Sequence, residues 1–182
     1  DVYKRQELNT PGVAGPYKGK KRSLYEGGIR VPSLVVWPAR QKELPVSMAV
    51  PCSTCDYLPT LAEWIGFELD KERTLDGESL CPMLQGKSVQ RKTPLVFCSG
   101  TQGALVDGHY KWYFNQGRAA LYDLANDPYE LQDISRQLPE VTARMQELWF
   151  SRMAEFRSSF DGKEYGTRSV ERMKQDWHDV TK

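Results

Sequence analysis

The stretch from residue 20 to residue 37 constrains the fold of this 182-residue chain more than any other feature. Three consecutive cations precede Glu26 and the pair Gly27-Gly28, which lets the backbone turn tightly. A continuous apolar run from Leu34 to Trp37 follows and predicts a strand buried on both faces. The pattern therefore predicts a loop that presents cations at a place fixed by the strand behind it.

Size and charge limit the classes of protein to which the chain can belong. Its length suits one ordinary domain or two small ones, and we predict a boundary between residues 1–88 and residues 89–182, in a charged stretch. The net charge of +1 and the pI of about 7.8 give no reason to expect nucleic acid as a partner. No apolar run is long enough for a membrane span. The oligomeric state cannot be read from the sequence.

One amphipathic helix is predicted in the first half, between residues 53 and 66. Ser, Thr and Asp at its start are good N-caps, and Gly66 supplies a left-handed stop. Leu58, Leu61 and Ile65 recur at helical spacing, so we expect them to face a core. The two cysteines near the start of the helix, and the other two in the chain, are interpreted as ordinary packed thiols.

The second half of the chain is predicted to form a small antiparallel sheet followed by a helix. Strands are predicted at residues 94–98, 104–106, 109–114 and 120–124, with a type I′ turn at Asp107-Gly108. The aromatic residues of the third segment alternate poorly with polar ones, so its buried face cannot be assigned; those at 110, 112 and 114 are interpreted as sheet core, with a sugar-binding platform as the alternative. A helix opens at Pro139, and its predicted apolar stripe consists of Val141, Met145, Leu148, Trp149 and Phe156.

Two motifs in the chain resemble the sulfatase family of the alkaline-phosphatase-like superfold. The first is the K-R-x-L-Y-E-G-G-I-R-V-P run that begins at Lys21, and the second is the L-Y-D-L-x-x-D-P-x-E run from Leu121 to Glu130. The resemblance implies an α/β fold class: the C-terminal portion of an alkaline-phosphatase-like sulfatase domain, followed by a small antiparallel sheet packed with a C-terminal helix.

The resemblance also implies site residues. The lysine of the first motif, which in the family reaches a non-bridging oxygen of the substrate sulfate, is Lys21 here; it is our candidate catalytic and substrate-binding residue. Lys20 is the alternative for the side chain that points into the site. Glu26 and Arg30 are interpreted as an internal charged pair that stiffens the loop. His109, just after a hairpin turn, is a second candidate for substrate contact, whereas His178 lies in a polar tail.

The cofactors that the family uses have no ligands that we can identify in this chain. The family makes a formylglycine nucleophile from a Cys or Ser in a C/S-x-P-x-R motif, and the run Cys81-Pro82-Met83 does not match it. We therefore expect the nucleophile and the calcium site in a missing N-terminal half, and assign no metal residue here. Residues 1–6 look non-native. The chain is interpreted as a fragment that is inactive alone.

The predicted function is that of a part of a sulfatase hydrolysing sulfate esters, with a sulfated small molecule or glycan as substrate. One alternative is a phosphatase or phosphonate hydrolase of the same superfold. Another is a non-catalytic carbohydrate-binding or interaction module. No signal peptide is visible, and the family resemblance implies a periplasmic or secreted parent enzyme.

Overall fold

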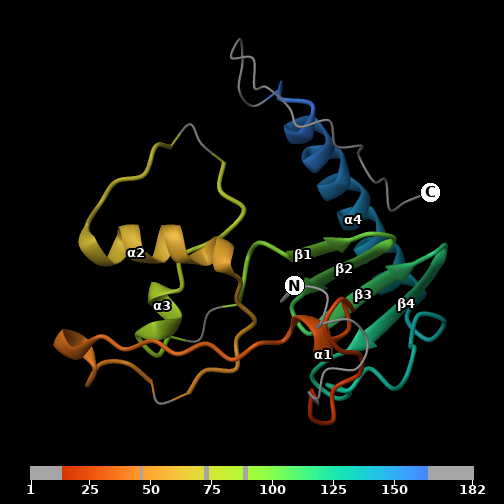
Figure 1. Ribbon diagram of the computed structural model, residues 1–182, viewed down its shortest axis with the longest axis horizontal. Helices are drawn as coiled ribbons and strands as arrows, with labels where there is room; N and C mark the ends of the chain where they lie inside the picture. Colours follow the sequence, from red (N-terminus) through yellow and green to blue (C-terminus); the bar gives the residue numbers. More distant parts are fainter. Residues whose placement is uncertain (1–13, 46, 72–73, 88–89, 164–182) are drawn as a thin grey trace, which may run out of the picture.

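The computed structural model describes residues 14–45, 47–71, 74–87 and 90–163 (Figure 1). The predictions for residues 1–6 and for His178 lie outside these ranges. The elements, in chain order, are α1 (Glu26–Ile29), η2 (Pro38–Arg40), η3 (Thr54–Asp56), α2 (Tyr57–Ile65), α3 (Cys81–Leu84), β1 (Leu95–Ser99), β2 (Gln102–Asp107), β3 (Tyr110–Asn115), β4 (Arg118–Asp123) and α4 (Pro139–Phe160). No helix within the described ranges is both long and apolar enough to cross a membrane.

The four strands form one antiparallel sheet in the order β1-β2-β3-β4, as predicted for the second half. Residues 108 and 109 form the turn between β2 and β3, and of these only Gly108 has a positive φ, 61°. The predicted type I′ turn is therefore wrong there, because that turn needs a positive φ at both central residues. Gln116 and Gly117, between β3 and β4, do meet this requirement.

Both faces of the sheet are covered, which explains why the aromatic residues of β3 do not alternate with polar ones. Trp112 packs on one face against α4, with its ring centroid 5.2 Å from that of Trp149. Tyr113 faces the other way and packs against Leu24, in the segment before α1. Successive side chains of a strand point to opposite faces, so neighbouring aromatic residues enter different cores. This arrangement confirms the interpretation of Trp112 as sheet core.

Helix α4 also follows the sequence pattern. Met145 and Trp149 of the predicted stripe are buried on the sheet, together with Met153 one turn further on. Figure 1 shows α4, drawn in blue, lying across the sheet. The period of the apolar residues was sufficient to predict this contact, because a long helix with one apolar face must bury that face.

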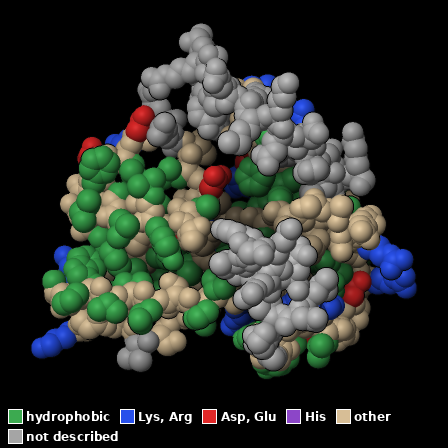
Figure 2. Space-filling model, viewed as in Figure 1, with side chains coloured by type: hydrophobic (Ala, Val, Ile, Leu, Met, Phe, Trp, Pro, Cys, Tyr) green, Lys and Arg blue, Asp and Glu red, His purple; other side chains and the backbone are tan. Residues whose placement is uncertain are grey.

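Helix α2 forms as predicted, but its apolar side is not buried. Gly66 ends it in the left-handed conformation, with φ 70°. Leu58, Leu61 and Ile65, which we expected to face a core, are 55%, 52% and 76% exposed. Figure 2 shows apolar side chains gathered on the surface of the half of the molecule that contains α2 and α3.

The predicted strand from Leu34 to Trp37 is absent. These residues belong to no strand or helix, and Leu34 is 86% exposed. A strand exists only when a neighbouring strand satisfies its backbone groups, and no described residue before Leu95 belongs to a strand. The apolar run favours a strand, but no described strand lies beside it to pair with its backbone, and so no strand forms.

Candidate functional site

The lysine loop, which we define as residues 18–30, doubles back tightly on itself. The backbone N–H of Gly27 donates to the carbonyl oxygen of Lys18 at 2.8 Å, and that of Gly28 donates to the carbonyl of Tyr25 at 2.8 Å. A Cβ atom on Gly28 would lie only 1.9 Å from the carbonyl oxygen of Ser23. The motif therefore requires glycine at position 28 because the backbone itself occupies the space of a side chain.

Both candidate lysines lie on the outside of this loop. Lys20 and Lys21 are exposed, so each side chain can reach a ligand, and burial does not distinguish them. Arg22, the next residue, has a φ of 77°. Its carbonyl oxygen accepts a hydrogen bond from the Gln102 side chain at 2.9 Å, and the same side chain accepts from the Leu24 N–H at 3.2 Å. Gln102 thus attaches the loop to the start of β2.

His109 lies far from this attachment point. It is exposed in the turn after β2, with its ring 4.1 Å from that of Tyr110. The five residue steps from Gln102 to Asp107 span roughly 16 Å of strand. The candidates Lys21 and His109 are therefore at opposite ends of β2, and one sulfate group would not contact both. Substrate contact by His109 stays a separate prediction.

A buried ion-pair cluster, formed by Glu26, Lys111 and Glu130, holds the other side of the loop. The Lys111 Nζ lies 2.9 Å from Glu26 Oε1 and 2.8 Å from Glu130 Oε1, and the Lys111 and Glu130 side chains are completely buried. The predicted pair of Glu26 with Arg30 is present at 3.7 Å, but Arg30 is half-exposed. The main partner of Glu26 is therefore Lys111, which is not among the residues predicted from the sequence.

Glu130 is the most constrained member of the cluster. Its Oε2 accepts a hydrogen bond from the backbone N–H of Glu26 at 2.6 Å. Burial raises the pKa of the Glu130 carboxyl above its ordinary value, while the nearby Lys111 ammonium opposes the shift. The residue also has a positive φ of 57°, a conformation that costs a non-glycine residue about 1–3 kcal/mol. A residue keeps such a strained conformation only where the contacts around it force the backbone into that conformation.

Lys18 adds a second contact between the loop and Glu130. Its Nζ donates to the Glu130 carbonyl oxygen at 3.1 Å and lies 3.3 Å from the Tyr122 hydroxyl. The same ammonium lies 4.2 Å from the centre of the Tyr25 ring.

One signal in the sequence could have indicated the ion-pair cluster. Lys111 is a single charge within an aromatic strand whose neighbours 110, 112 and 113 pack into cores.

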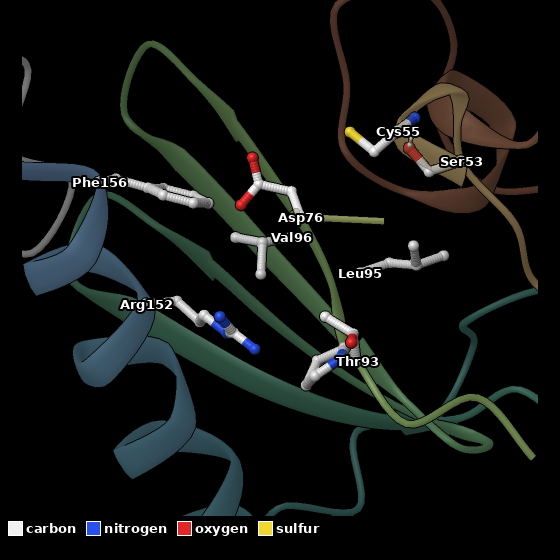
Figure 3. Close-up of a pocket in the computed structure, with 9 residues that line it drawn as sticks. Ser53, Cys55, Asp76, Thr93, Leu95, Val96, Arg152 and Phe156 are labelled. Atoms are coloured by element: carbon white, nitrogen blue, oxygen red, sulfur yellow. Dashed lines mark hydrogen bonds between the residues drawn. The ribbon is translucent and has the colours of Figure 1, made fainter. Parts of the chain in front are cut away.

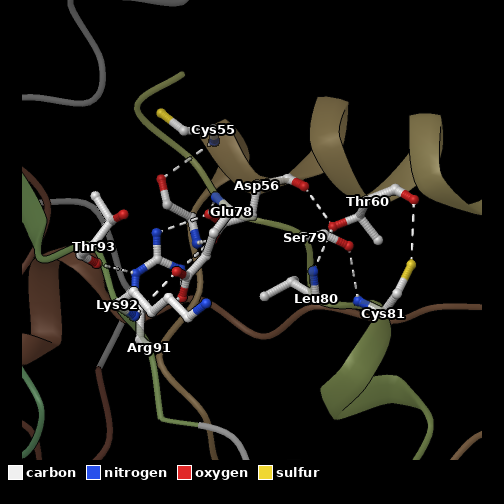
Figure 4. Close-up of polar contacts among 11 residues, drawn as sticks. Cys55, Asp56, Thr60, Glu78, Ser79, Leu80, Cys81, Arg91, Lys92 and Thr93 are labelled. Carbon is white, nitrogen blue, oxygen red and sulfur yellow. Dashed lines mark hydrogen bonds and ion pairs between the residues drawn. The ribbon is translucent and has the colours of Figure 1, made fainter. Parts of the chain in front are cut away.

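A second buried ion pair joins Asp56, directly before α2, to Arg91, in the segment before β1 (Figure 4). The guanidinium of Arg91 binds both carboxylate oxygens of Asp56, at 2.7 Å and 2.8 Å. Asp56 also accepts the backbone N–H groups of Ser53 and Glu78. These contacts cross the boundary predicted at residues 88 and 89, which themselves lie outside the described ranges. The division into two domains stays a prediction.

The pocket in Figure 3 is a poor candidate for a substrate site. It lies between β1, α4 and the segment around Cys55, and its volume of about 90 Å³ is well below the 300 Å³ or more of typical small-molecule sites. Its one cation, Arg152, is already paired with Glu155 at 2.7 Å. The pocket can hold a few water molecules but not a sugar ring.

The cysteines in the described part of the chain lie in no C/S-x-P-x-R motif, and they form no metal site with the acidic residues there. Cys81 is 1% exposed, and burial raises the pKa of its thiol. Cys52 and Cys55 are exposed, so the interpretation of all four as packed thiols is wrong for these two. Cys98 is exposed as a residue, but its Sγ lies 4.0 Å from Met153 Sδ and burial raises the pKa of its thiol to about 11. No group of three His, Cys, Asp or Glu side chains that could hold a metal ion occurs among the described residues.

Replacing Gly28 by alanine is expected to disrupt the lysine loop. The added Cβ would meet the Ser23 carbonyl, and we expect a loss of about 3 kcal/mol or more in the free energy of unfolding, measured by urea denaturation. Gly86→Ala is the matched control, because that glycine has a positive φ but open space around it, so only about 1 kcal/mol should be lost. Equal losses from the two variants would contradict the tight approach at Gly28.

Comparison with known proteins places the chain among named relatives. No protein-family model matches the chain. Human steryl-sulfatase is 40% identical over 86 residues, which cover 47% of this chain and 15% of that protein. Human arylsulfatase A is 31% identical over 174 residues, which cover 78% of this chain and 34% of that protein. The chain thus spans at most about a third of the length of these relatives.

The fold agrees with the sequence comparison. The crystal structure of Ps i-CgsB in complex with k-i-k-neocarrahexaose matches 74% of this chain and 32% of that chain, with a TM-score of 0.64 and 27% identity. A second solved structure, that of BT33336S-sulf from the metabolism of glycosaminoglycans by Bacteroides thetaiotaomicron, matches 82% of this chain and 34% of that chain, with a TM-score of 0.66 and 27% identity. Sulfatases of the alkaline-phosphatase-like fold are thus among the structures that share this fold. By sequence and by fold, the chain therefore belongs to the sulfatase family, in which it matches a C-terminal part of the catalytic domain.

Proposed function

We propose that this chain is part of an enzyme that hydrolyses sulfate esters, and that Lys21 binds the sulfate. The observation that carries this proposal is the lysine loop, which matches the sulfatase motif in sequence. Its inner residue Glu26 is buried in an ion pair, while Lys21 itself stays exposed. A cation on a firmly held loop can meet a ligand in a defined geometry, which a cation on a mobile surface loop cannot.

The chemistry of sulfate esters explains why a lysine is suitable. In hydrolysis the bond between sulfur and the ester oxygen breaks, water supplies the new oxygen on sulfur, and the ester oxygen leaves with a proton as the alcohol. Negative charge stays on the non-bridging oxygens while sulfur is attacked in line. A compact ammonium such as that of Lys21 interacts with these oxygens as a point charge and donates hydrogen bonds to them.

The nucleophile and metal of the proposed enzyme are assigned to the part of the protein that this chain does not contain. The family uses formylglycine and calcium, and a hard divalent ion needs about six oxygen ligands. The described residues provide no such group, and the buried Cys81 is not in a C/S-x-P-x-R motif. The role proposed here is therefore limited to binding and orienting the sulfate.

A sulfated carbohydrate is the substrate class that we favour. One solved structure similar to this chain is a complex with k-i-k-neocarrahexaose, and the near-neutral charge of the chain gives no reason to expect nucleic acid. A periplasmic or secreted location is proposed from the family resemblance alone.

The complete reading frame tests this function. We expect a C/S-x-P-x-R motif upstream, and we expect the full-length protein to hydrolyse an aryl sulfate and a sulfated oligosaccharide in preference to the matching phosphate and phosphonate esters. The 182-residue chain alone should show no turnover on any of them, and it serves as the control. Preference for phosphate or phosphonate would favour the other enzymes of the superfold. Binding of glycan without any hydrolysis by the full-length protein would favour a non-catalytic module.

A further inference from the structure

The buried ion-pair cluster of Glu26, Lys111 and Glu130 has no role in the function described so far. We propose that Lys111 and Glu130 are positioning residues, which set the place of the Lys21 ammonium through the lysine loop. This inference rests on the proposed function, because it concerns how the same site is held. The cluster joins distant parts of the chain: 85 residues separate Glu26 from Lys111, and 104 separate Glu26 from Glu130.

Glu130 holds the lysine loop on both sides of Lys21. Its carbonyl oxygen accepts a hydrogen bond at 3.1 Å from Lys18, three residues before Lys21. Its carboxylate accepts the backbone N–H at 2.6 Å from Glu26, five residues after Lys21. One residue of the C-terminal motif therefore fixes two points of the loop, and the candidate cation lies between them.

Lys111 fixes the orientation of the two carboxylates. Its Nζ contacts Glu26 at 2.9 Å and Glu130 at 2.8 Å without access to solvent. A buried ion pair adds little net stability compared with apolar residues of the same size, but its directional contacts favour a single arrangement. The lysine loop needs stabilising contacts from outside itself, because α1 has only four residues and so short a helix is not stable alone.

The loop itself supplies a direct assay for this role. Trypsin cleaves after lysine and arginine, so Lys20, Lys21 and Arg22 report how readily the loop opens. In the 182-residue chain, we expect Glu130→Gln and Lys111→Met to raise the rate of cleavage at these three bonds by about tenfold or more. Glu130→Gln leaves Lys111 with one of its two carboxylate partners and weakens the contact to the Glu26 N–H, and Lys111→Met leaves two buried carboxylates without their cation. Lys111→Arg, which keeps the charge, should restore most of the protection.

Asp107→Asn is the matched control for this assay. It makes the same carboxylate-to-amide change in a pair with Arg144 that is half-exposed, so cleavage in the lysine loop should not change. Mass measurement of the fragments identifies the bonds that are cut. Equal cleavage rates in the unsubstituted chain, Glu130→Gln and Lys111→Met would overturn the proposal, and so would acceleration by Asp107→Asn to the same extent.

A double-mutant cycle in the complete enzyme separates positioning from general stability. Glu130→Gln should lower kcat by about tenfold to a hundredfold when Lys21 is present, because a small displacement of a catalytic group is costly. It should cause no further loss in a Lys21→Ala background. Equal losses in both backgrounds would show a merely structural role and overturn the inference. If the complete enzyme hydrolyses no sulfate ester, the proposed function fails, whereas the trypsin assay still decides whether the cluster holds the loop.

Discussion

Replacing Lys21 by alanine in the complete enzyme is expected to lower turnover by about two to three orders of magnitude. The loss of one preorganised donor to a developing anion has an effect of this size. Because the charge interaction strengthens as sulfur is attacked, kcat should fall more than the affinity for substrate. Steady-state kinetics on an aryl sulfate and on a sulfated oligosaccharide measure both quantities.

Lys20→Ala is the matched control for this prediction. The two lysines are adjacent, have the same charge and are both exposed, so non-specific electrostatic effects on an anionic substrate should be similar for the two variants. We expect Lys20→Ala to reduce turnover far less than Lys21→Ala. Equal losses from the two variants, or no loss from Lys21→Ala, would remove the assignment of Lys21.

The second large effect is expected at Asp56, outside the lysine loop. Asp56→Ala should lower the free energy of unfolding by about 3–5 kcal/mol, because it removes the bidentate partner of the buried Arg91 guanidinium and leaves that group only a longer contact to a carboxylate, that of Glu78 at 3.9 Å. The Asp56 side chain is fully buried and that of Arg91 is 6% exposed. Urea denaturation of the chain measures the change, with circular dichroism as the signal. Glu155→Ala is the control, since the Glu155 side chain, which pairs with Arg152, is 56% exposed and the pair should be worth less than about 1 kcal/mol.

The pH dependence of the Asp56 variant tests whether charge is the cause. Burial alone would raise the pKa of Asp56, but the hydrogen bonds from Arg91 and from the backbone of Glu78 and Ser53 outweigh it, so the pKa lies below its ordinary value. A group of this kind stabilises the folded state above its unfolded pKa of about 3.9, and this contribution is lost as the pH falls through the lowered value. The difference between Asp56→Ala and the unsubstituted chain should therefore shrink below about pH 4. A difference that stays constant into stronger acid would point to packing instead.

The local pattern of the sequence was enough to predict most of the second half. The strands, the helix that opens at Pro139 and its contact through Trp149 follow from period and turn residues, because these elements find their partners within the same short stretch of chain. The stop of α2 at Gly66 was predictable for the same reason, since a left-handed terminal residue is a local requirement.

Patterns that depend on a distant partner were predicted less well. The run from Leu34 to Trp37 has the composition of a buried strand, yet no described strand lies beside it and it stays exposed. The apolar side of α2 is exposed as well, at Leu58, Leu61 and Ile65. Periodicity shows that a residue could be buried, but burial itself needs a second surface, and the sequence of the segment does not contain that surface.

The sequence by itself determined the identity of the lysine loop: its cations, its acid and the glycine at position 28 that its tight turn requires. Only the tertiary structure decided what holds that loop. Charged residues are normally solvated, so Lys111 and Glu130 gave little local sign that they would be completely buried. Their burial depends on each other and on Glu26, across 85 to 104 residues of chain. Such a cluster forms only when the folded chain brings opposite charges together in a place without water, which no single stretch of sequence specifies.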